Sequence, residues 1–165
     1  MPHDTLSTLA TLTGTRLKAK GLKLACAESC TGGWIAMAVT AVAGSSEWFD
    51  RGFVTYSNEA KEEMLGIARA TLEAHGAVSE ATAREMAQGA INKSRAQIAV
   101  AVTGVAGPGG GTDAKPVGTV CIAWAGPAEK LHCETRRFEG DREQVRRKTV
   151  IAALQGIIEL LEEKQ

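Results

Sequence analysis

The residues best suited to chemistry follow the first apolar run of the chain, in the stretch AESCTGG at positions 27–33. Ser29 could act as a nucleophile, because the main-chain amides after a strand-to-helix junction lack intrahelical partners and could hold an oxyanion or a phosphate. Cys30 is a competing nucleophile, although a small thiol more often fills a core. Alternatively, Ser29 or Thr31 only caps the following helix, and capping serines outnumber catalytic ones. The stretch alone leaves these interpretations open.

A serine nucleophile needs a general base, and lysine suits this role better than histidine in this sequence. The three histidines, His3, His75 and His132, occupy the leading tail, a position before a turn glycine and a late strand. Lys61 falls in the first turn of a predicted helix, where the helix dipole disfavours a positive charge and partial burial would lower its pKa further. Tyr56, at the end of the preceding strand, could relay a proton. Alternatively, Lys61 is a solvated partner of a glutamate, and Tyr56 is a packing residue.

A glycine-rich stretch, GVAGPGGGTDAKPVG at 104–118, follows a later predicted strand that ends at Thr103. It has neither the lysine of a P-loop nor the helix of a dinucleotide-binding turn, so neither phosphate motif is met. Its glycines could still bring main-chain amides close to a ligand, with the hydroxyl of Thr103 beside them. The alternative is a mobile connection between strands. Arg142, in the basic run DREQVRRK, could bind a phosphate or belong to a solvated helix face.

The elements that must position these residues alternate between helix and strand through the first half of the chain. Apolar spacing and capping residues predict helices over 4–21, 31–44, 58–67, 79–95 and 141–164. Apolar or alternating runs predict strands over 22–27, 52–57, 97–103, 119–126 and 131–138. This order predicts an α/β fold, a three-layer α/β/α arrangement with a mixed sheet of about five strands. Because the three polar clusters all follow strands, we expect them to meet at the carboxyl ends of the sheet.

The length of 165 residues fits a single domain that covers 1–165. Nineteen basic residues balance nineteen acidic ones, which argues against a general binder of nucleic acid or membrane surfaces. The four cysteines form no C-x-x-C pair and no zinc-ligand set, so we expect no metal and a reduced, cytoplasmic protein. The sequence has no run long and apolar enough for a membrane span, and its first residues do not resemble a cleavable signal segment.

Several long motifs, taken together and in this order, resemble one family. They are AESCTGG, GSSEWFDRGFVTYSNEAKEEMLGI, GAVSEATAREMAQGA, AVTGVAGPGGGTDAKPVGTV and FEGDREQVRRKT. From about residue 6 to the last helix, the chain resembles the C-terminal domain of the competence-associated protein CinA, the nicotinamide-nucleotide amidase family. The resemblance implies an amidohydrolase without metal or cofactor that converts nicotinamide mononucleotide to nicotinate mononucleotide and ammonia in pyridine-nucleotide recycling. It also implies a stand-alone form, and we expect a homo-oligomer.

The resemblance also assigns roles to matching positions. It implies that Ser29 is the nucleophile, that Lys61 is the general base and that Tyr56 assists. The positions that would bind the nucleotide are Thr31, Gly32, Gly33, Asn58, Thr103, Gly104, Gly107, Gly109 and Arg142. Two departures lie beside the nucleophile and bear on the shape of the pocket: Cys26 replaces a frequent threonine, and Trp34 replaces a smaller aliphatic residue. Two rival hypotheses are a nucleotide-binding module without chemistry and a thiol enzyme that uses the neighbouring cysteine.

Overall fold

The computed structural model describes residues 4–162, which form six α-helices, one short 3-10 helix and five strands. The helices are α1 (Thr5–Lys20), α2 (Trp34–Thr40), α3 (Asn58–Leu65), α4 (Arg69–His75), α5 (Glu80–Asn92) and α6 (Arg142–Glu162), with the 3-10 helix at Ser45–Glu47. The strands are β1 (Leu24–Glu28), β2 (Phe49–Val54), β3 (Ile98–Gly104), β4 (Thr119–Ala125) and β5 (Leu131–Arg137). They form one sheet in the order β2-β1-β3-β4-β5.

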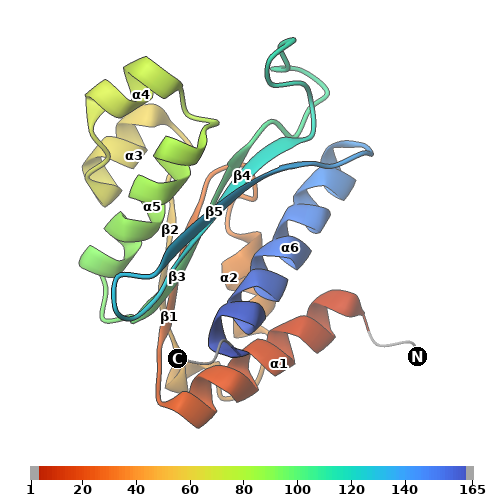
Figure 1. Ribbon diagram of the computed structural model, residues 1–165. Helices are drawn as coiled ribbons and strands as arrows, with labels where there is room; N and C mark the ends of the chain where they lie inside the picture. Colours follow the sequence, from red (N-terminus) through yellow and green to blue (C-terminus); the bar gives the residue numbers. More distant parts are fainter. Residues whose placement is uncertain (1–3, 163–165) are drawn as a thin grey trace.

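Helices cover both faces of this sheet (Figure 1). The first, second and last helices, α1, α2 and α6, pack on one face, and α3, α4 and α5 pack on the other. β1 runs parallel to β2 and β3, whereas β4 runs antiparallel to β3 and β5. The predicted three-layer α/β/α fold with a mixed sheet of five strands is confirmed. The chain passes from β2 across β1 to β3, and α/β sheets bind ligands at the carboxyl ends of strands around such a crossing.

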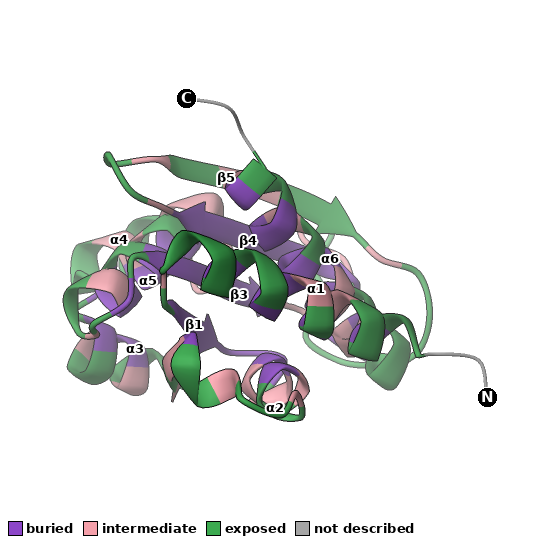
Figure 2. Ribbon diagram, turned by 90° about the horizontal axis from the view of Figure 1, so that it is seen from below, coloured by how far each residue is buried: buried purple, intermediate pink, exposed green. Residues whose placement is uncertain are grey.

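The two faces of the central strands differ in the size of their side chains, because alternate residues of a strand point to opposite sides. Large apolar side chains point toward α1, α2 and α6: Leu24, Ile98, Val100, Val102, Val120, Ile122 and Trp124. Small ones point toward α5: Ala25, Ala27, Ala99, Ala101, Cys121, Ala123 and Ala125. Figure 2 shows the buried residues concentrated in β1, β3 and β4 and on the inner sides of the helices. The small side chains let α5 pack close to the strands that carry the site.

Three elements differ from the prediction. α2 begins later than the predicted range 31–44, because Gly32 and Gly33 have φ angles of +59° and +109°, which a right-handed helix does not accommodate, and it ends earlier, at Thr40. β2 starts before the predicted range 52–57, since Phe49 already pairs with β1. α4 lies in a segment for which the sequence predicts no element. The other predicted helices and strands are present, with ends that differ by a few residues.

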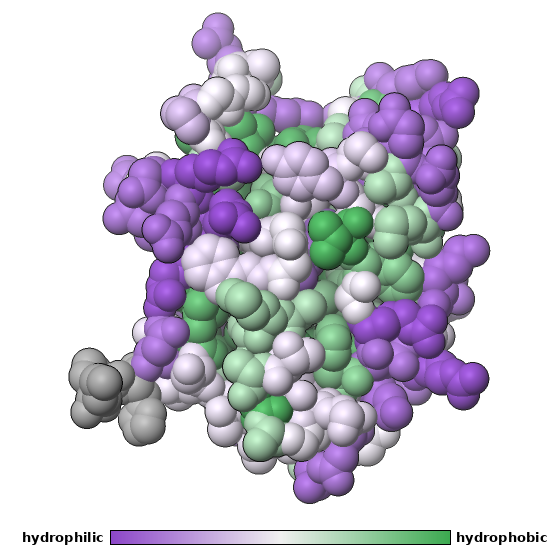
Figure 3. All heavy atoms as spheres, turned by 180° about the vertical axis from the view of Figure 1, so that it is seen from behind, coloured by the Kyte–Doolittle hydropathy of each residue, from purple (hydrophilic) through white to green (hydrophobic). Residues whose placement is uncertain are grey.

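The surface over α2 is uncharged, because the segment 29–46 carries no acidic or basic side chain. Met37 on this helix is 62% exposed, and Val54 on the neighbouring edge strand β2 is 46% exposed. Figure 3, which shows the molecule from behind, has pale and green residues across the middle of this face and purple residues at its rims. None of the helices within residues 4–162 is both long and apolar enough to cross a membrane.

Candidate active site

A cleft of about 310 Å³ opens at the carboxyl ends of β1 and β3, toward the top of the view in Figure 1. This volume lies at the lower end of the ~300–1,000 Å³ usual for small-ligand clefts. Eight of the twelve predicted site residues line it: Ser29, Tyr56, Lys61, Thr103, Gly104, Gly107, Gly109 and Arg142. The other lining residues are Cys30, Ala77, Val78, Val105, Ala106 and Gly110. The remaining predicted residues, Thr31, Gly32, Gly33 and Asn58, are not part of the lining.

The predicted nucleophile and the predicted base are in direct contact within this cleft. The amine of Lys61 donates a hydrogen bond to the hydroxyl of Ser29, with Nζ and Oγ 3.1 Å apart. The same amine donates to the main-chain carbonyls of Thr55, at 2.9 Å, and Tyr56, at 3.3 Å. Lys61 is only 1% exposed. A buried lysine is therefore held by one hydroxyl and two carbonyl oxygens, and none of these three acceptors carries a formal charge.

Burial lowers the pKa of Lys61, because an amine removed from water is harder to protonate. The residue reaches this position from the first turn of α3, as predicted. Ser57 caps that helix by accepting from the amide of Ala60 at 3.0 Å, and the amide of Lys61 donates to the carbonyl of Ser57. A lowered pKa increases the neutral fraction of the amine, and a neutral amine can accept the proton of Ser29.

Main-chain bonds hold the turn that carries Ser29. The amide of Ser29 donates to the carbonyl of Val102 on β3, and the carbonyl of Ser29 accepts from the amide of Gly32, both at 3.1 Å. Because the amide of Gly32 is used within the turn, it is not free to hold an oxyanion. The amide of Cys30, the one residue of 30–33 that lines the cleft, is the better candidate for that role.

Glu28, the residue before Ser29, has no role in the prediction from sequence, and the structure places its carboxylate inside the turn. Its side chain is completely buried. It accepts from the hydroxyl of Thr31 at 2.6 Å and from the amides of Ile35 and Ala36 at 2.8 and 3.1 Å. The side chain of Thr31 therefore supports the turn from within and does not face the cleft.

Arg146 on α6 is a second residue that the prediction from sequence missed. Its guanidinium donates to the carbonyls of Cys30, at 3.0 Å, and Thr31, at 3.1 Å. The same group lies over the ring of Trp34, 5.5 Å from the ring centroid, in the geometry of a cation–π contact. Hydrogen bonds from α6 therefore hold the nucleophile turn through two of its carbonyls.

Cys30 lines the cleft but is poorly suited to nucleophilic attack. Its side chain is buried, and burial raises the pKa of its thiol to about 12. The thiol therefore stays protonated at neutral pH, whereas the thiolate is the nucleophilic form of cysteine. This environment disfavours the thiol mechanism and leaves the hydroxyl of Ser29 as the better candidate.

Tyr56 and Arg142 meet at the rim of the cleft. Tyr56 is 61% exposed, and its hydroxyl accepts a hydrogen bond from Nη2 of Arg142 at 3.3 Å. Nη1 of Arg142 donates to the carbonyl of Gly107 at 2.8 Å, which ties the start of α6 to the glycine-rich loop. Tyr56 contacts Lys61 through its main-chain carbonyl, and its hydroxyl is bonded to Arg142 instead.

The glycine-rich loop is tied to the segment around α4 at both of its ends. Thr103, just before the loop, donates its hydroxyl proton to the carbonyl of Ala77 at 2.9 Å. Lys115, near the far end, donates to the carbonyl of His75 at 2.9 Å. These bonds position the loop so that several of its glycines line the cleft.

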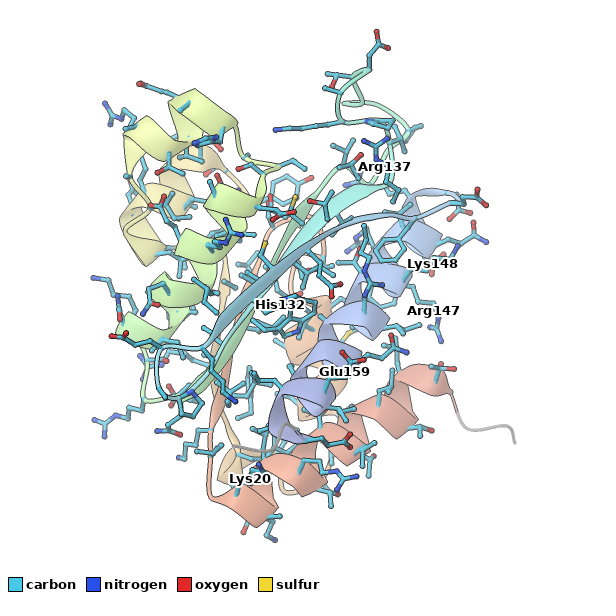
Figure 4. The ribbon with its side chains drawn as sticks, in the orientation of Figure 1. Lys20, His132, Arg137, Arg147, Lys148 and Glu159 are labelled. Atoms are coloured by element: carbon cyan, nitrogen blue, oxygen red, sulfur yellow. The ribbon has the colours of Figure 1, made fainter. Side chains whose placement is uncertain are left out.

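Neither of the two histidines in the described residues lines the cleft. His75 ends α4, and His132 lies on β5, where its ring stacks on Trp124 with 5.7 Å between the centroids. Figure 4 shows His132 beside α6, on the face of β5 that this helix covers. His3 lies outside the described residues. Residues 4–162 also contain no group of three or more His, Cys, Asp and Glu side chains arranged to hold a metal ion.

Comparisons with known proteins show which family the chain resembles. The family model of the CinA C-terminal domain matches residues 6–161. A nicotinamide-nucleotide amidohydrolase PncC from Enterobacter agglomerans is 52% identical over 155 residues, which cover 94% of each chain. The protein of that name from Escherichia coli K12 is 50% identical over 157 residues, 95% of each chain. The crystal structure of the competence/damage inducible protein CihA from Agrobacterium tumefaciens matches with a TM-score of 0.94 and 46% identity, over 99% of both chains.

Proposed function

The chain belongs to the CinA C-terminal domain family, and we propose that it deamidates nicotinamide mononucleotide to nicotinate mononucleotide and ammonia, in pyridine-nucleotide recycling. The names of relatives about half identical over nearly the whole chain support this substrate. The observation that carries the proposal is the contact between Ser29 and the buried amine of Lys61, in a cleft of ligand size. A binding module without chemistry has no need to bury a lysine against a serine hydroxyl.

In the proposed reaction the amine of Lys61 is neutral and donates its two protons to the carbonyls of Thr55 and Tyr56. Its lone pair then accepts the proton of the Ser29 hydroxyl as Oγ attacks the carboxamide carbon. The amide of Cys30 stabilises the oxyanion that forms. The C–N bond then breaks, the proton held by Lys61 passes to the leaving nitrogen, and ammonia departs from an acyl-serine. Water attacks this ester and gives a proton to Lys61, which returns it to Ser29 as nicotinate mononucleotide leaves.

The rest of the nucleotide extends, in this proposal, from Ser29 toward the rim of the cleft, where Arg142 supplies a positive charge. A guanidinium can bind a phosphate through two parallel hydrogen bonds, and the glycines of the loop let main-chain amides approach the ligand. The hydrogen bond between Tyr56 and Arg142 favours a role for Tyr56 in binding the substrate over a role in proton transfer.

Product analysis after incubation with nicotinamide mononucleotide tests the proposal. We expect equal amounts of ammonia and nicotinate mononucleotide to form, including in the presence of a chelator. Without any ammonia, a nucleotide that still raises the melting temperature would support the binding module instead.

We also propose that the protein works in a reducing cytoplasm. Cys26, Cys30, Cys121 and Cys133 are all free thiols, as is usual where cellular reductants act. The homo-oligomer expected from the sequence stays a prediction, and light scattering during size-exclusion chromatography would test it.

A further inference from the structure

We propose that Glu28 is a positioning residue for the amidase reaction, and that its carboxylate sets the placement of Ser29 against Lys61. This inference rests on the function proposed above. It starts from the burial of Glu28, whose side chain has no access to solvent. A buried carboxylate is costly unless hydrogen bonds replace the water that it loses. Here the donors all come from the residues around the nucleophile.

The carboxylate joins the end of β1 to the start of α2 across the Ser29 turn. Its two oxygens accept from the hydroxyl of Thr31 and from the amides of Ile35 and Ala36, and the thiol of Cys26 lies 3.6 Å from one of them. The side chain of Glu28 therefore binds both Thr31, in the middle of the turn, and the first amides of α2, where the turn ends.

These hydrogen bonds replace the side-chain N-cap that α2 lacks. The N-cap residue of α2 is Gly33, which has no side chain to accept from the first amides of the helix. Its φ angle of +109° is a conformation in which residues with side chains are strained, so the cap cannot come from a larger residue at that position. Glu28 supplies the missing acceptor from the neighbouring strand.

The main chain of Glu28 is also connected to Lys61, the proposed base, through hydrogen bonds of Thr55. Its carbonyl accepts from the amide of Thr55 at 2.8 Å, and the carbonyl of Thr55 accepts from the amine of Lys61 at 2.9 Å. With the bond from Lys61 to Ser29, these contacts close a ring through four residues. A shift of Glu28 therefore changes the geometry on both sides of the reacting pair.

Steady-state kinetics of Glu28→Gln test the inference. The amide keeps the size of the side chain, but it has one acceptor oxygen where the carboxylate has two. We expect kcat for ammonia release to fall about 10- to 100-fold, because small misplacements of reacting groups have effects of this size. KM should change less than about threefold, because Glu28 does not line the cleft. Circular dichroism at a temperature below the melting transition checks that the variant is folded.

A threonine series keeps the inference testable if Glu28→Gln does not fold. Thr31→Val removes one donor to Glu28 and should lower kcat, whereas Thr31→Ser keeps the hydroxyl and should restore it. Thr40→Val is the matched control, since Thr40 bonds only to carbonyls of its own helix and should leave kcat unchanged. If Glu28→Gln folds and its kcat stays within twofold of the wild type, the inference is overturned. If Glu28→Gln does not fold, the same result in Thr31→Val overturns it. A change in KM with an unchanged kcat would also overturn it. A wild-type protein that releases no ammonia would reject the proposed function itself.

Discussion

The amine of Lys61 lies 3.1 Å from the hydroxyl of Ser29, although 32 positions separate the two residues in the sequence. Ser29 follows β1, and Lys61 lies in the first turn of α3, just after β2. Because β1 and β2 are parallel neighbours, their carboxyl ends bring the two side chains to the same edge of the sheet.

Ser29→Ala should abolish ammonia release while nucleotide binding persists. The substitution removes the attacking oxygen and leaves the turn, the loop and Arg142 in place. Losing a nucleophile typically lowers kcat by about 10³-fold or more. Coupled detection of ammonia measures the loss, and a thermal shift with nicotinamide mononucleotide measures binding. Full activity in the folded variant would show that another group attacks.

The activity should depend on the deprotonation of Lys61. Because burial lowers the pKa of this amine, kcat/KM should rise with pH and level off below 10.5, the pKa of an ordinary lysine. Lys61→Met should remove the activity at every pH. A pH profile from 5 to 11 in the wild type would check this, and a rise that continues up to about 10.5 would argue against a lowered pKa.

The free energy of unfolding should also depend on the protonation of Lys61. Burying the protonated amine of Lys61 lowers the free energy of unfolding. This loss is complete at pH values below the lowered pKa and disappears as the pH approaches 10.5, where the amine is neutral in both states. The free energy of unfolding of the wild type, measured relative to Lys61→Met, should therefore increase with pH across that window. Urea denaturation at several pH values gives this difference. The exposed Lys20, replaced in the same way, serves as the control for the loss of one surface charge.

Alkylation should not inactivate the enzyme quickly at neutral pH. The pKa of the Cys30 thiol is raised to about 12 by burial, so almost no thiolate is present to react. We expect iodoacetamide at pH 7 to leave most of the ammonia release intact over an hour. Rapid inactivation that nicotinamide mononucleotide prevents, together with an active Ser29→Ala, would support the thiol mechanism.

Arg146→Ala should affect both stability and catalysis. The change removes two hydrogen bonds to the nucleophile turn and the contact with Trp34, so we expect the free energy of unfolding to fall by about 1–3 kcal/mol. A looser turn should also lower kcat by roughly tenfold. Arg147→Ala is the matched control, because that side chain pairs with Asp4 at the surface, and its loss should cost less than about 1 kcal/mol. Equal effects of the two substitutions would contradict the role of Arg146.

The sheet and most of its helices could be predicted from the sequence because each depends on a local pattern. For Ser29 and Lys61 the local patterns left alternatives open, and the family resemblance singled out the pair. A buried strand before Ser29 and a capping serine before Lys61 are visible within a few residues. The parallel arrangement then brings the two together. Glu28 could not be found in this way, since its carboxylate meets amides seven and eight positions later, across a turn bent by two glycines. Arg146 meets carbonyls 116 and 115 positions earlier, and in the sequence it is one member of a basic run.

The same reason explains why α2 and α4 were the helices that the sequence predicted least well. Both lack a side-chain cap of their own and depend on carboxylates from other elements. Glu28 holds the start of α2, and Glu85 on α5 accepts from the amide of Ala68 and the hydroxyl of Thr71 at the start of α4. A helix end that is stabilised across the fold leaves no start signal beside it in the sequence.

The two acceptors that orient Lys61, apart from Ser29, are the carbonyls of Thr55 and Tyr56, which belong to the backbone. A backbone carbonyl is present whichever amino acid occupies the position. Sequences could therefore drift at 55 and 56 without deleting either acceptor, and only a change in the path of the chain would release the lysine. During evolution, the orientation of the Lys61 amine should therefore be conserved more strongly than the amino acids at positions 55 and 56.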